Sequence, residues 1–317
     1  MRAALAALPL RVDEVACVRT AVALPSYPDE PRPHALATLA GGGREGRGEH
    51  VGFSADAHQA FAARAARCAP FAGTVGAYAV EVLGALPAHD RAALEAAAVD
   101  LALRQRGATL FALAGAAPRP LRYVVSFGRT PDPAAAARAA GDVGLKVDVD
   151  PSWAASTLHA LAAAGRVEVL DWKGGGTRAD HERAHAVFPD ALVEDPDPAA
   201  APWSASLARR LSVDQALLAP ADLDRLPVAP VAANLKPARL GGVLALLDTA
   251  AACAARGVAI YLGGMFELDA GRRQLHALAA LLCPDAPNDV APIPRDDRPL
   301  ARPPRLAVDA TAPGFGA

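Results

Sequence analysis

The chain has 317 residues, of which 52% are hydrophobic and 21% are charged, and its formal net charge is -2. This composition supports one large or two modest folded domains and excludes wholesale disorder. With 32 basic and 34 acidic residues, nothing indicates a nucleic-acid or anionic-membrane partner. Every long apolar run is interrupted before the roughly 20 residues that a membrane span needs, so we expect no membrane segment.

The cysteines lie far apart and lack the spacing of a metal-binding or redox pair; they are Cys17, Cys68, Cys253 and Cys283. A chain of this length does not need disulfides for stability. We therefore expect a reducing, cytoplasmic location.

Residues 1–118 show the pattern of an α+β domain. Alternation predicts a strand over residues 10–22, the glycine-rich residues 41–48 predict a turn, and residues 50–53 are predicted to return as the second strand of a hairpin. Apolar residues at intervals of three and four predict helices over residues 57–68 and 88–106, the second ending at Gly107.

From residue 121 onward, short apolar strands alternate with alanine-rich helical stretches, which is typical of a parallel sheet covered by helices. Seven strands are predicted, over residues 123–127, 144–149, 167–172, 191–194, 211–214, 231–236 and 258–262. They favour an α/β fold, a modified (β/α)8 barrel of the TIM type over residues 119–290, with its active site at the C-terminal ends of the strands. A doubly wound open sheet is the alternative. Residues 291–317 are so rich in Pro and Asp that composition alone predicts a disordered tail.

Acidic side chains stand where three consecutive predicted strands end. Asp171, Glu194 and Asp214 are 23 and 20 residues apart, about one strand-helix unit each. Their side chains are therefore expected to converge at one rim of the barrel. Carboxylate oxygens in that number suit Mg²⁺, and Mn²⁺ is the alternative ion.

Lysine is rare in this chain, because only Lys146, Lys173 and Lys236 occur among the 32 basic residues. Arginine serves as well on a solvated surface, but a guanidinium cannot give up its proton as an amine can. Each lysine also lies at or just past the end of a predicted strand. Because side chains alternate along a strand, Lys146 and Asp148 share a face, and so do Asp171 and Lys173. All three lysines are thus candidate catalytic residues at the same rim.

The segment His181-Glu182-Arg183-Ala184-His185 matches the HExxH pattern of zinc proteases. It falls in a short polar helix on the outer layer of the predicted barrel, so we interpret both histidines as part of a solvated helix face. Residues 174–176 are glycines after a strand and predict a loop that borders the site. Beyond the seventh strand, Glu267 is a candidate substrate contact, whereas Asp269 and Arg272 are expected on the surface.

Several motifs resemble the enolase superfamily, and within it the muconate cycloisomerase branch with its o-succinylbenzoate synthases, N-succinylamino acid racemases and dipeptide epimerases. The matching segments are Gly46-Arg47-Gly48-Glu49, residues 96–103, Val193-Glu194-Asp195-Pro196, residues 235–242, Gly263-Gly264-Met265-Phe266-Glu267 and Pro313-Gly314-Phe315-Gly316. The resemblance implies that residues 1–118 form a capping domain, which the tail 291–317 completes by packing against it.

By position, the resemblance implies Asp171, Glu194 and Asp214 as Mg²⁺ ligands and Lys236 as the lysine of the sixth strand. In such enzymes the ion binds a substrate carboxylate, a base removes the proton from the adjacent carbon, and the ion stabilises the resulting enediolate. A neutral lysine serves as the base.

Two strands depart from the pattern of the family. The second strand usually ends Lys-x-Lys, with the second lysine as base, but here reads Lys146-Val147-Asp148. The third usually ends Asp-x-Asn, but here reads Asp171-Trp172-Lys173. Our hypothesis is that Lys173, or Lys146 reoriented by Asp148, supplies the amine on that face, with Lys236 opposite. The competing hypothesis is that the proton chemistry has been lost or altered.

The expected function is therefore Mg²⁺-dependent removal of a proton next to a carboxylate. A dehydration like that of o-succinylbenzoate synthase is favoured, since it needs only one lysine. Epimerisation of an acylated amino acid or dipeptide is the alternative, and a non-catalytic scaffold that binds an acidic ligand is the second alternative. A small-molecule carboxylate is the expected partner, and a homo-oligomer is an open alternative to a monomer.

Overall fold

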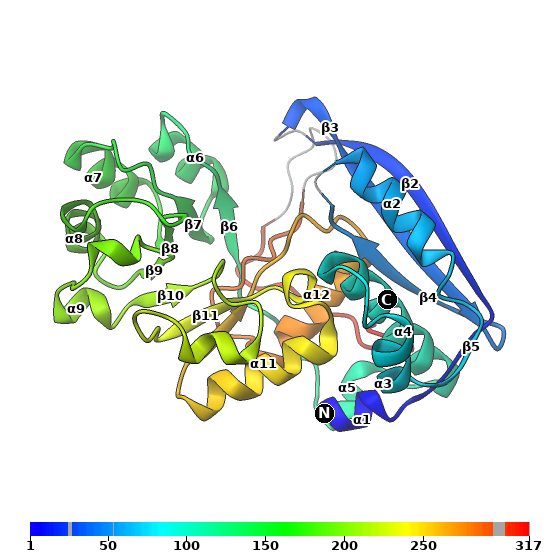
Figure 1. Ribbon diagram of the computed structural model, residues 1–317. Helices are drawn as coiled ribbons and strands as arrows, with labels where there is room; N and C mark the ends of the chain where they lie inside the picture. The colour runs from blue at the N-terminus through cyan, green and yellow to red at the C-terminus, as the bar shows by residue number, and fades with distance from the viewer. Residues whose placement is uncertain (25–26, 53, 294–301, 317) are drawn as a thin grey trace.

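The computed structural model describes residues 1–24, 27–52, 54–293 and 302–316. Two units lie side by side, with a long antiparallel ribbon in the first and a parallel sheet with outer helices in the second (Figure 1). Within the described residues, no helix is long and apolar enough to cross a membrane.

The first unit contains α1 (Arg2–Ala6), β1 (Pro9–Val12), β2 (Glu14–Leu24), β3 (Tyr27–Gly41), β4 (Arg44–His50), α2 (Ala55–Ala65), β5 (Phe71–Thr74), α3 (Val75–Ala77), the π-helical turn η1 (Tyr78–Val82), α4 (Ala88–Arg106) and α5 (Leu110–Ala114). The second contains β6 (Val124–Phe127), α6 (Pro133–Ala140), β7 (Gly144–Asp148), α7 (Ala155–Ala164), β8 (Val167–Asp171), α8 (Arg178–Val187), β9 (Leu192–Glu194), the 3₁₀ turn η2 (Pro198–Ala200), α9 (Ala205–Ala208), β10 (Leu211–Val213), the 3₁₀ turn η3 (Pro220–Asp224), β11 (Ala232–Leu235), α10 (Pro237–Leu240), α11 (Val243–Ala255), β12 (Ala259–Leu262) and α12 (Ala270–Leu282).

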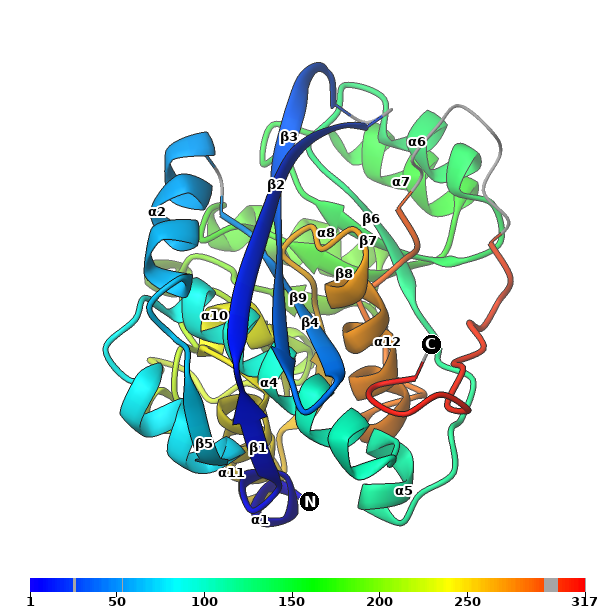
Figure 2. The same cartoon turned by 90° about the vertical axis from the view of Figure 1, so that its right-hand side faces the viewer.

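The N-terminal sheet differs from the predicted hairpin. The single strand expected over residues 10–22 is divided at Asp13 into β1 and β2, and β2, β3 and β4 form a three-stranded antiparallel sheet, whose strands can be followed in Figure 2. Most of the glycine-rich segment is strand β4, and only Gly42 and Gly43, both with positive φ, form the turn. The prediction of a long turn was wrong because glycine was taken as a turn signal only. β4 ends at His50, and Phe53 of the predicted return strand lies outside the described residues.

The glycines of β4 allow the strand to lie directly on α4. A Cβ on Gly46 would lie 2.2 Å from the backbone nitrogen of Leu101, and one on Gly48 would lie 1.9 Å from the carbonyl oxygen of Ala93. Such a close approach of strand and helix leaves no space for any side chain at these two positions. The predicted helix over residues 88–106 is confirmed as α4, and the left-handed Gly107 ends it.

The barrel strands are parallel and follow the chain in order from β6 to β12, so the barrel is confirmed and the open doubly wound sheet is excluded. Their register aligns the site. Asp171 is the Cα partner of Asp148 on β7 and of Glu194 on β9. The acidic ends of three neighbouring strands therefore lie at one level.

Residues Asn288 and Asp289 close the barrel without forming a full strand. Asn288 makes a parallel bridge with Tyr123 beside β6, and Asp289 makes one with Gly263 beside β12. The buried side chain of Asn288 adds further bonds, because its Oδ1 accepts from Leu262 N at 2.8 Å and its Nδ2 donates to Arg122 O at 3.0 Å. One amide side chain thus joins the two free edges of the sheet, whose backbone groups would otherwise lack partners.

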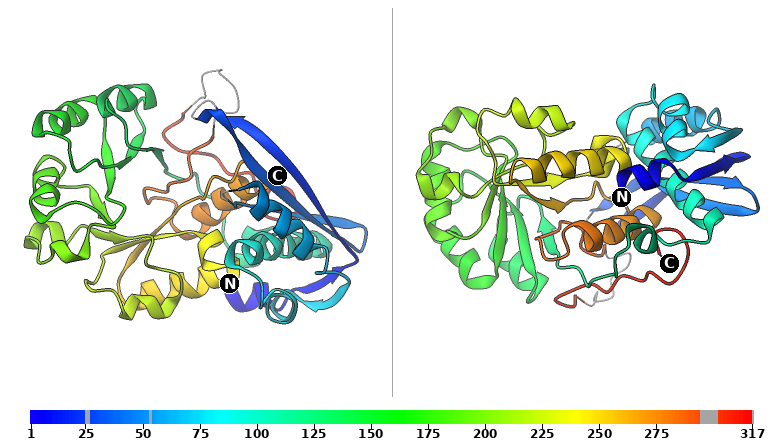
Figure 3. Two further views of the ribbon diagram at one scale, coloured as in Figure 1. Left: turned by 45° about the horizontal axis from the view of Figure 1, so that its top comes forward. Right: turned by 90° about the horizontal axis from the view of Figure 1, so that it is seen from below.

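Helices α11 and α12 lie between the parallel sheet and the N-terminal unit, as both views of Figure 3 show. The described part of the tail returns to the N-terminal unit. Gly314 N donates to Ala108 O, Leu110 N donates to Gly314 O, and Phe315 N donates to the Asp100 carboxylate on α4. Residues 294–301 and 317 of the predicted tail lie outside the described residues.

Candidate metal and catalytic site

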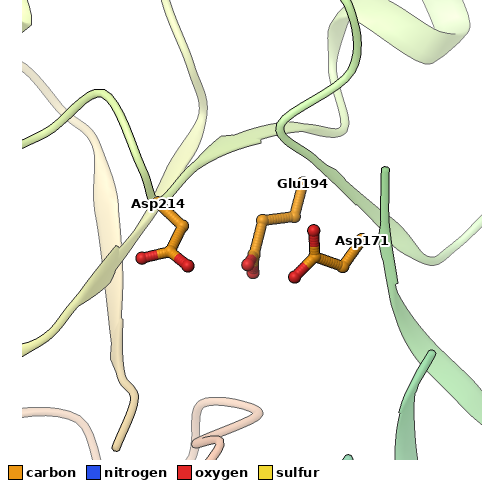
Figure 4. Close-up of side chains that lie close together, drawn as sticks. All are labelled: Asp171, Glu194 and Asp214. Atoms are coloured by element: carbon orange, nitrogen blue, oxygen red, sulfur yellow. The ribbon is translucent and has the colours of Figure 1, made fainter. Parts of the chain in front are cut away.

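Three carboxylates converge at the C-terminal ends of β8, β9 and β10. Asp171, Glu194 and Asp214 each offer an oxygen, these oxygens lie within 4.8 Å of one another, and all three residues are buried. Glu194 lies between the other two in Figure 4. The structure therefore brings together the three residues that the sequence singled out as metal ligands. Three closely spaced hard oxygen donors fit a divalent cation such as Mg²⁺ or Mn²⁺.

Lys146 of β7 contacts this group and is buried, with only 1% of its surface exposed. Its Nζ donates to Glu194 Oε1 and lies 3.0 Å from Asp171 Oδ2 and 3.5 Å from Asp289 Oδ2. Burial acts to lower the pKa of Lys146, but Glu194, Asp289 and Asp171 outweigh it and raise that pKa well above its usual value. Lys146 is thus an ammonium that holds two of the carboxylates together.

Lys173 directs its amine back to the ends of β7 and β8. Its Nζ donates to Asp171 Oδ2 and lies 3.2 Å from Asp148 Oδ1, while 36% of its side chain stays exposed. Burial acts to lower the pKa of Lys173, but the contact with Asp171 outweighs it and raises the pKa. For the carboxylate of Asp148, burial acts in the other direction and raises the pKa, although Lys173 opposes the rise. The amine of Lys173, just after β8, thus lies beside Asp148, the position at which the resemblance noted in the sequence implies a lysine.

Lys236 approaches the carboxylates from their other end. It follows β11 and is 8% exposed, and its Nζ donates to Asp214 Oδ2 at 2.7 Å. Arg239, one turn further on, donates to Asp214 Oδ1 at 2.5 Å. Lys173 and Lys236 therefore flank the row of carboxylates at its two ends.

The structure adds neighbours that the sequence reasoning missed. Tyr261 donates its hydroxyl to Glu194 Oε2 and is itself bonded to Ser212 at 2.8 Å, and Asn234 Nδ2 lies 3.4 Å from the same carboxylate oxygen. Burial, followed by the charge of Glu194, raises the pKa of Tyr261 well above its usual value. These polar side chains occur inside apolar strand segments. The one feature of the sequence that could have identified them is a polar residue at a position expected to be in the core.

Opposing effects act on the carboxylates themselves. Burial raises the pKa of Glu194, although Lys146 opposes the rise. Burial would also raise the pKa of Asp171, but Lys146 and Lys173 outweigh it and keep the pKa low. Asp171 therefore carries a full negative charge at neutral pH.

Glu267 is held within the loop after β12. Its buried Oε2 accepts from Met265 N at 2.8 Å and lies 3.9 Å from Arg272 Nη2. The surface placement expected for Arg272 was wrong, because this side chain packs against Glu267 and is 8% exposed. Glu49 of β4 joins the same junction by accepting from Asp269 N at 2.8 Å and Gly271 N at 2.9 Å at the start of α12.

The HExxH motif lies on α8, and its histidines are buried rather than solvated, so that interpretation was wrong. His181 is 0% and His185 is 7% exposed. Both ring nitrogens of His181 have protein partners, since Nε2 bonds Gly175 O and Nδ1 accepts from Trp203 Nε1. Glu182 accepts from Ser204 N at 2.6 Å. The motif stabilises local structure through these bonds.

Two family models together match most of the chain. The C-terminal domain model of "Domain of unknown function (DUF8230)" matches residues 117–297, and the N-terminal domain model of the same family matches residues 3–113. The chain belongs to the DUF8230 family.

Solved structures with the same fold cover nearly all of this DUF8230 protein. A structure described as a mandelate racemase/muconate lactonizing enzyme from Sorangium cellulosum is 24% identical, has a TM-score of 0.80, and covers 97% of this chain and 99% of its own. The dipeptide epimerase from Methylococcus capsulatus, complexed with Mg ion, is 22% identical, has a TM-score of 0.79 and gives the same coverage. The resemblance to the enolase superfamily is thus confirmed for the fold.

A curated relative also matches by sequence. The N-succinylamino acid racemase of an Amycolatopsis species is 29% identical over 164 residues. The match covers 48% of this chain and 44% of the racemase, so the DUF8230 protein spans less than half the length of that relative.

Proposed function

We propose that this DUF8230 protein is a divalent-cation-dependent racemase or epimerase that moves the proton on the carbon next to a substrate carboxylate. An N-acylated amino acid or a dipeptide is the proposed substrate class. The observation that carries the proposal is the position of Lys173 and Lys236 at the two ends of the carboxylate row. Inversion at a carbon by two acid-base groups needs one group on each face, and here the two lysines are placed to serve.

The carboxylates Asp171, Glu194 and Asp214 would hold the cation. Bound there, the cation would join the lysines as a partner of these carboxylates and would stabilise the negative charge that develops on the substrate carboxylate. Mg²⁺ is the favoured ion because the donors are all oxygens.

The lysines would carry the proton. One amine, in its neutral form, takes the proton from one face of the carbon, and the ammonium of the other returns a proton to the opposite face. Asp148 would orient Lys173, whose amine it contacts at 3.2 Å. Lys146, which is fully enclosed, would balance the charge of Glu194 and Asp171 rather than contact the substrate.

A dehydratase was favoured from the sequence because Asp148 stands where the resemblance implies a second catalytic lysine. Because Lys173 brings an amine to that position, this reason no longer holds. Dehydration stays a second candidate, since it needs one amine and Lys236 beside Asp214 can supply it. The Amycolatopsis racemase and the Methylococcus epimerase are relatives or fold neighbours whose names agree with the first candidate.

The test is proton exchange in deuterated water with Mg²⁺ or Mn²⁺, followed by proton NMR. The substrates are N-succinyl amino acids, dipeptides and the o-succinylbenzoate precursor. Loss of the α-proton signal with formation of the opposite stereoisomer supports the proposal, whereas an unsaturated product supports the dehydratase. No exchange with any substrate would favour a binding scaffold. Lys173→Arg and Lys236→Arg keep the charge but cannot act as bases, so each should slow inversion at least about 100-fold.

A further inference from the structure

The loop that carries Lys173 has a backbone conformation that needs support. Lys173 has a φ of 52°, in the left-handed region that a residue with a Cβ rarely adopts. Two hydrogen bonds fix one side of this loop. Gly174 N donates to the carbonyl oxygen of Asp195, just after the neighbouring strand β9, at 2.8 Å, and Lys173 N donates to Asp171 Oδ1 at 3.1 Å.

His181 of α8 supports the other side of the loop. Its Nε2 bonds Gly175 O at 2.9 Å, and its Nδ1 accepts from Trp203 Nε1 at 3.0 Å. Because Nδ1 accepts, the hydrogen of the neutral ring lies on Nε2, where it donates to the loop. The ring also meets Trp172 edge to face, with the ring centroids 4.4 Å apart. Trp203 thus orients a histidine that in turn binds the loop.

The contact between loop and ring leaves no free space. A Cβ on Gly176 would lie 2.7 Å from His181 Nε2 and 2.6 Å from Trp172 Cε3. The loop therefore packs directly against the two rings.

We propose that His181 is a positioning residue, which holds the loop of residues 172–177 so that the Lys173 amine stays between Asp148 and Asp171. The role in catalysis rests on the proposed function, because Lys173 is there one of the two proton carriers. Lys236 follows a different strand, β11, and has its own contact with Asp214, so the support by His181 acts on the Lys173 amine only.

The test uses variants of the full chain that change the two hydrogen bonds of the ring. His181→Phe keeps a flat ring in the same space but makes neither bond, and His181→Gln can both donate to Gly175 O and accept from Trp203. Trp203→Phe removes only the Nε1 donor to His181, and it replaces His181→Phe as the test variant if His181→Phe does not fold. The matched control is His185→Phe, one turn along α8 and similarly buried.

The first readout is hydrogen-deuterium exchange of residues 172–177 by mass spectrometry, without metal or substrate. Exchange should become about tenfold faster in His181→Phe, return toward the wild-type rate in His181→Gln and stay unchanged in His185→Phe. Unchanged exchange in both His181→Phe and Trp203→Phe would overturn the proposal.

The second readout separates positioning from general loss of structure. With an active substrate, Lys236 can exchange the proton of one stereoisomer without help from Lys173, but inversion needs both amines. His181→Phe should therefore lower inversion about tenfold relative to exchange from that stereoisomer. Equal loss of both would overturn the positioning role. If the wild type exchanges no substrate, the proposed function fails, while the first readout still decides whether His181 holds the loop.

Discussion

Replacement of Lys146 by Met tests whether the carboxylate row is a cation site. The variant keeps an unbranched side chain of similar length but removes the ammonium that contacts Glu194 and Asp171. Those two carboxylates, both 0% exposed, would then lie together without their shared counter-charge.

The loss of stability follows from the burial of the pair. Removing one partner of a buried ion pair costs about 3–5 kcal/mol, because the remaining charge cannot be solvated. For a chain of this size that is a fall of roughly 10 °C in the midpoint of thermal unfolding. A divalent cation that binds the folded protein at about 100 times its dissociation constant returns about 2.7 kcal/mol. Mg²⁺ should therefore restore most of the lost stability in Lys146→Met.

The assay is thermal unfolding followed by circular dichroism, with and without Mg²⁺. The matched control is Arg64→Met in the N-terminal unit, where Arg64 Nε lies 2.5 Å from the buried carboxylate of Asp90. That variant should also lose stability, but Mg²⁺ should raise its midpoint no more than that of the wild type. If Mg²⁺ leaves the midpoint of Lys146→Met unchanged, the carboxylate row is not the cation site.

Three further predictions concern pH, metal content and packing. Burial raises the pKa of Glu95 to about 7, while amides at the start of α11 such as Leu244 N, 2.8 Å away, oppose the rise. Since the folded state then binds the proton more tightly than the unfolded state, stability should fall as the pH rises from about 4.5 to about 7, by at most about 3 kcal/mol. Urea unfolding across this range should show a flatter profile for Glu95→Gln, and an identical profile would contradict the assignment. Asp171→Ala should lower the Mg²⁺ or Mn²⁺ content of the protein, measured by mass spectrometry after equilibrium dialysis, at least about tenfold, and equal content would remove this residue from the ligand set. Gly48→Ala should reduce the free energy of unfolding by more than about 3 kcal/mol because its methyl group would enter the backbone of α4, whereas Gly43→Ala, with no atom within 4 Å of the new methyl group, should cost about 1 kcal/mol; similar values in urea unfolding would refute the packing argument.

The sequence predicted the barrel and its acidic rim because both depend on local pattern. Apolar strands at a regular interval specify parallel strand-helix units. An acidic residue at the end of each apolar run then lies level with its neighbour, as the pairing of Asp171 with Glu194 shows. The scarcity of lysine pointed to Lys146, Lys173 and Lys236, and the structure places all three against the carboxylates.

Other parts of the site depend on contacts between distant segments. Tyr261 reaches Glu194 across 67 positions of the chain, and Asp289 lies at a bridge too short to show strand periodicity. His181 appeared solvated because its neighbours in the sequence are polar, but its environment is set by Trp172 and Trp203. The glycines of β4 likewise reflect a helix that follows them by about 50 residues.

The closure at Asn288 has a consequence for motion. A closed barrel has no free strand edge, and here the closure consists of two single-residue bridges and the hydrogen bonds of one amide side chain, so we expect local opening to begin at this seam. Separation at this seam would leave the other strand pairs intact. It would also withdraw Asp289 from Lys146, since the carboxylate belongs to the residue next to the amide. Local opening of the barrel and the charge around Lys146 are thus linked through the adjacent residues Asn288 and Asp289.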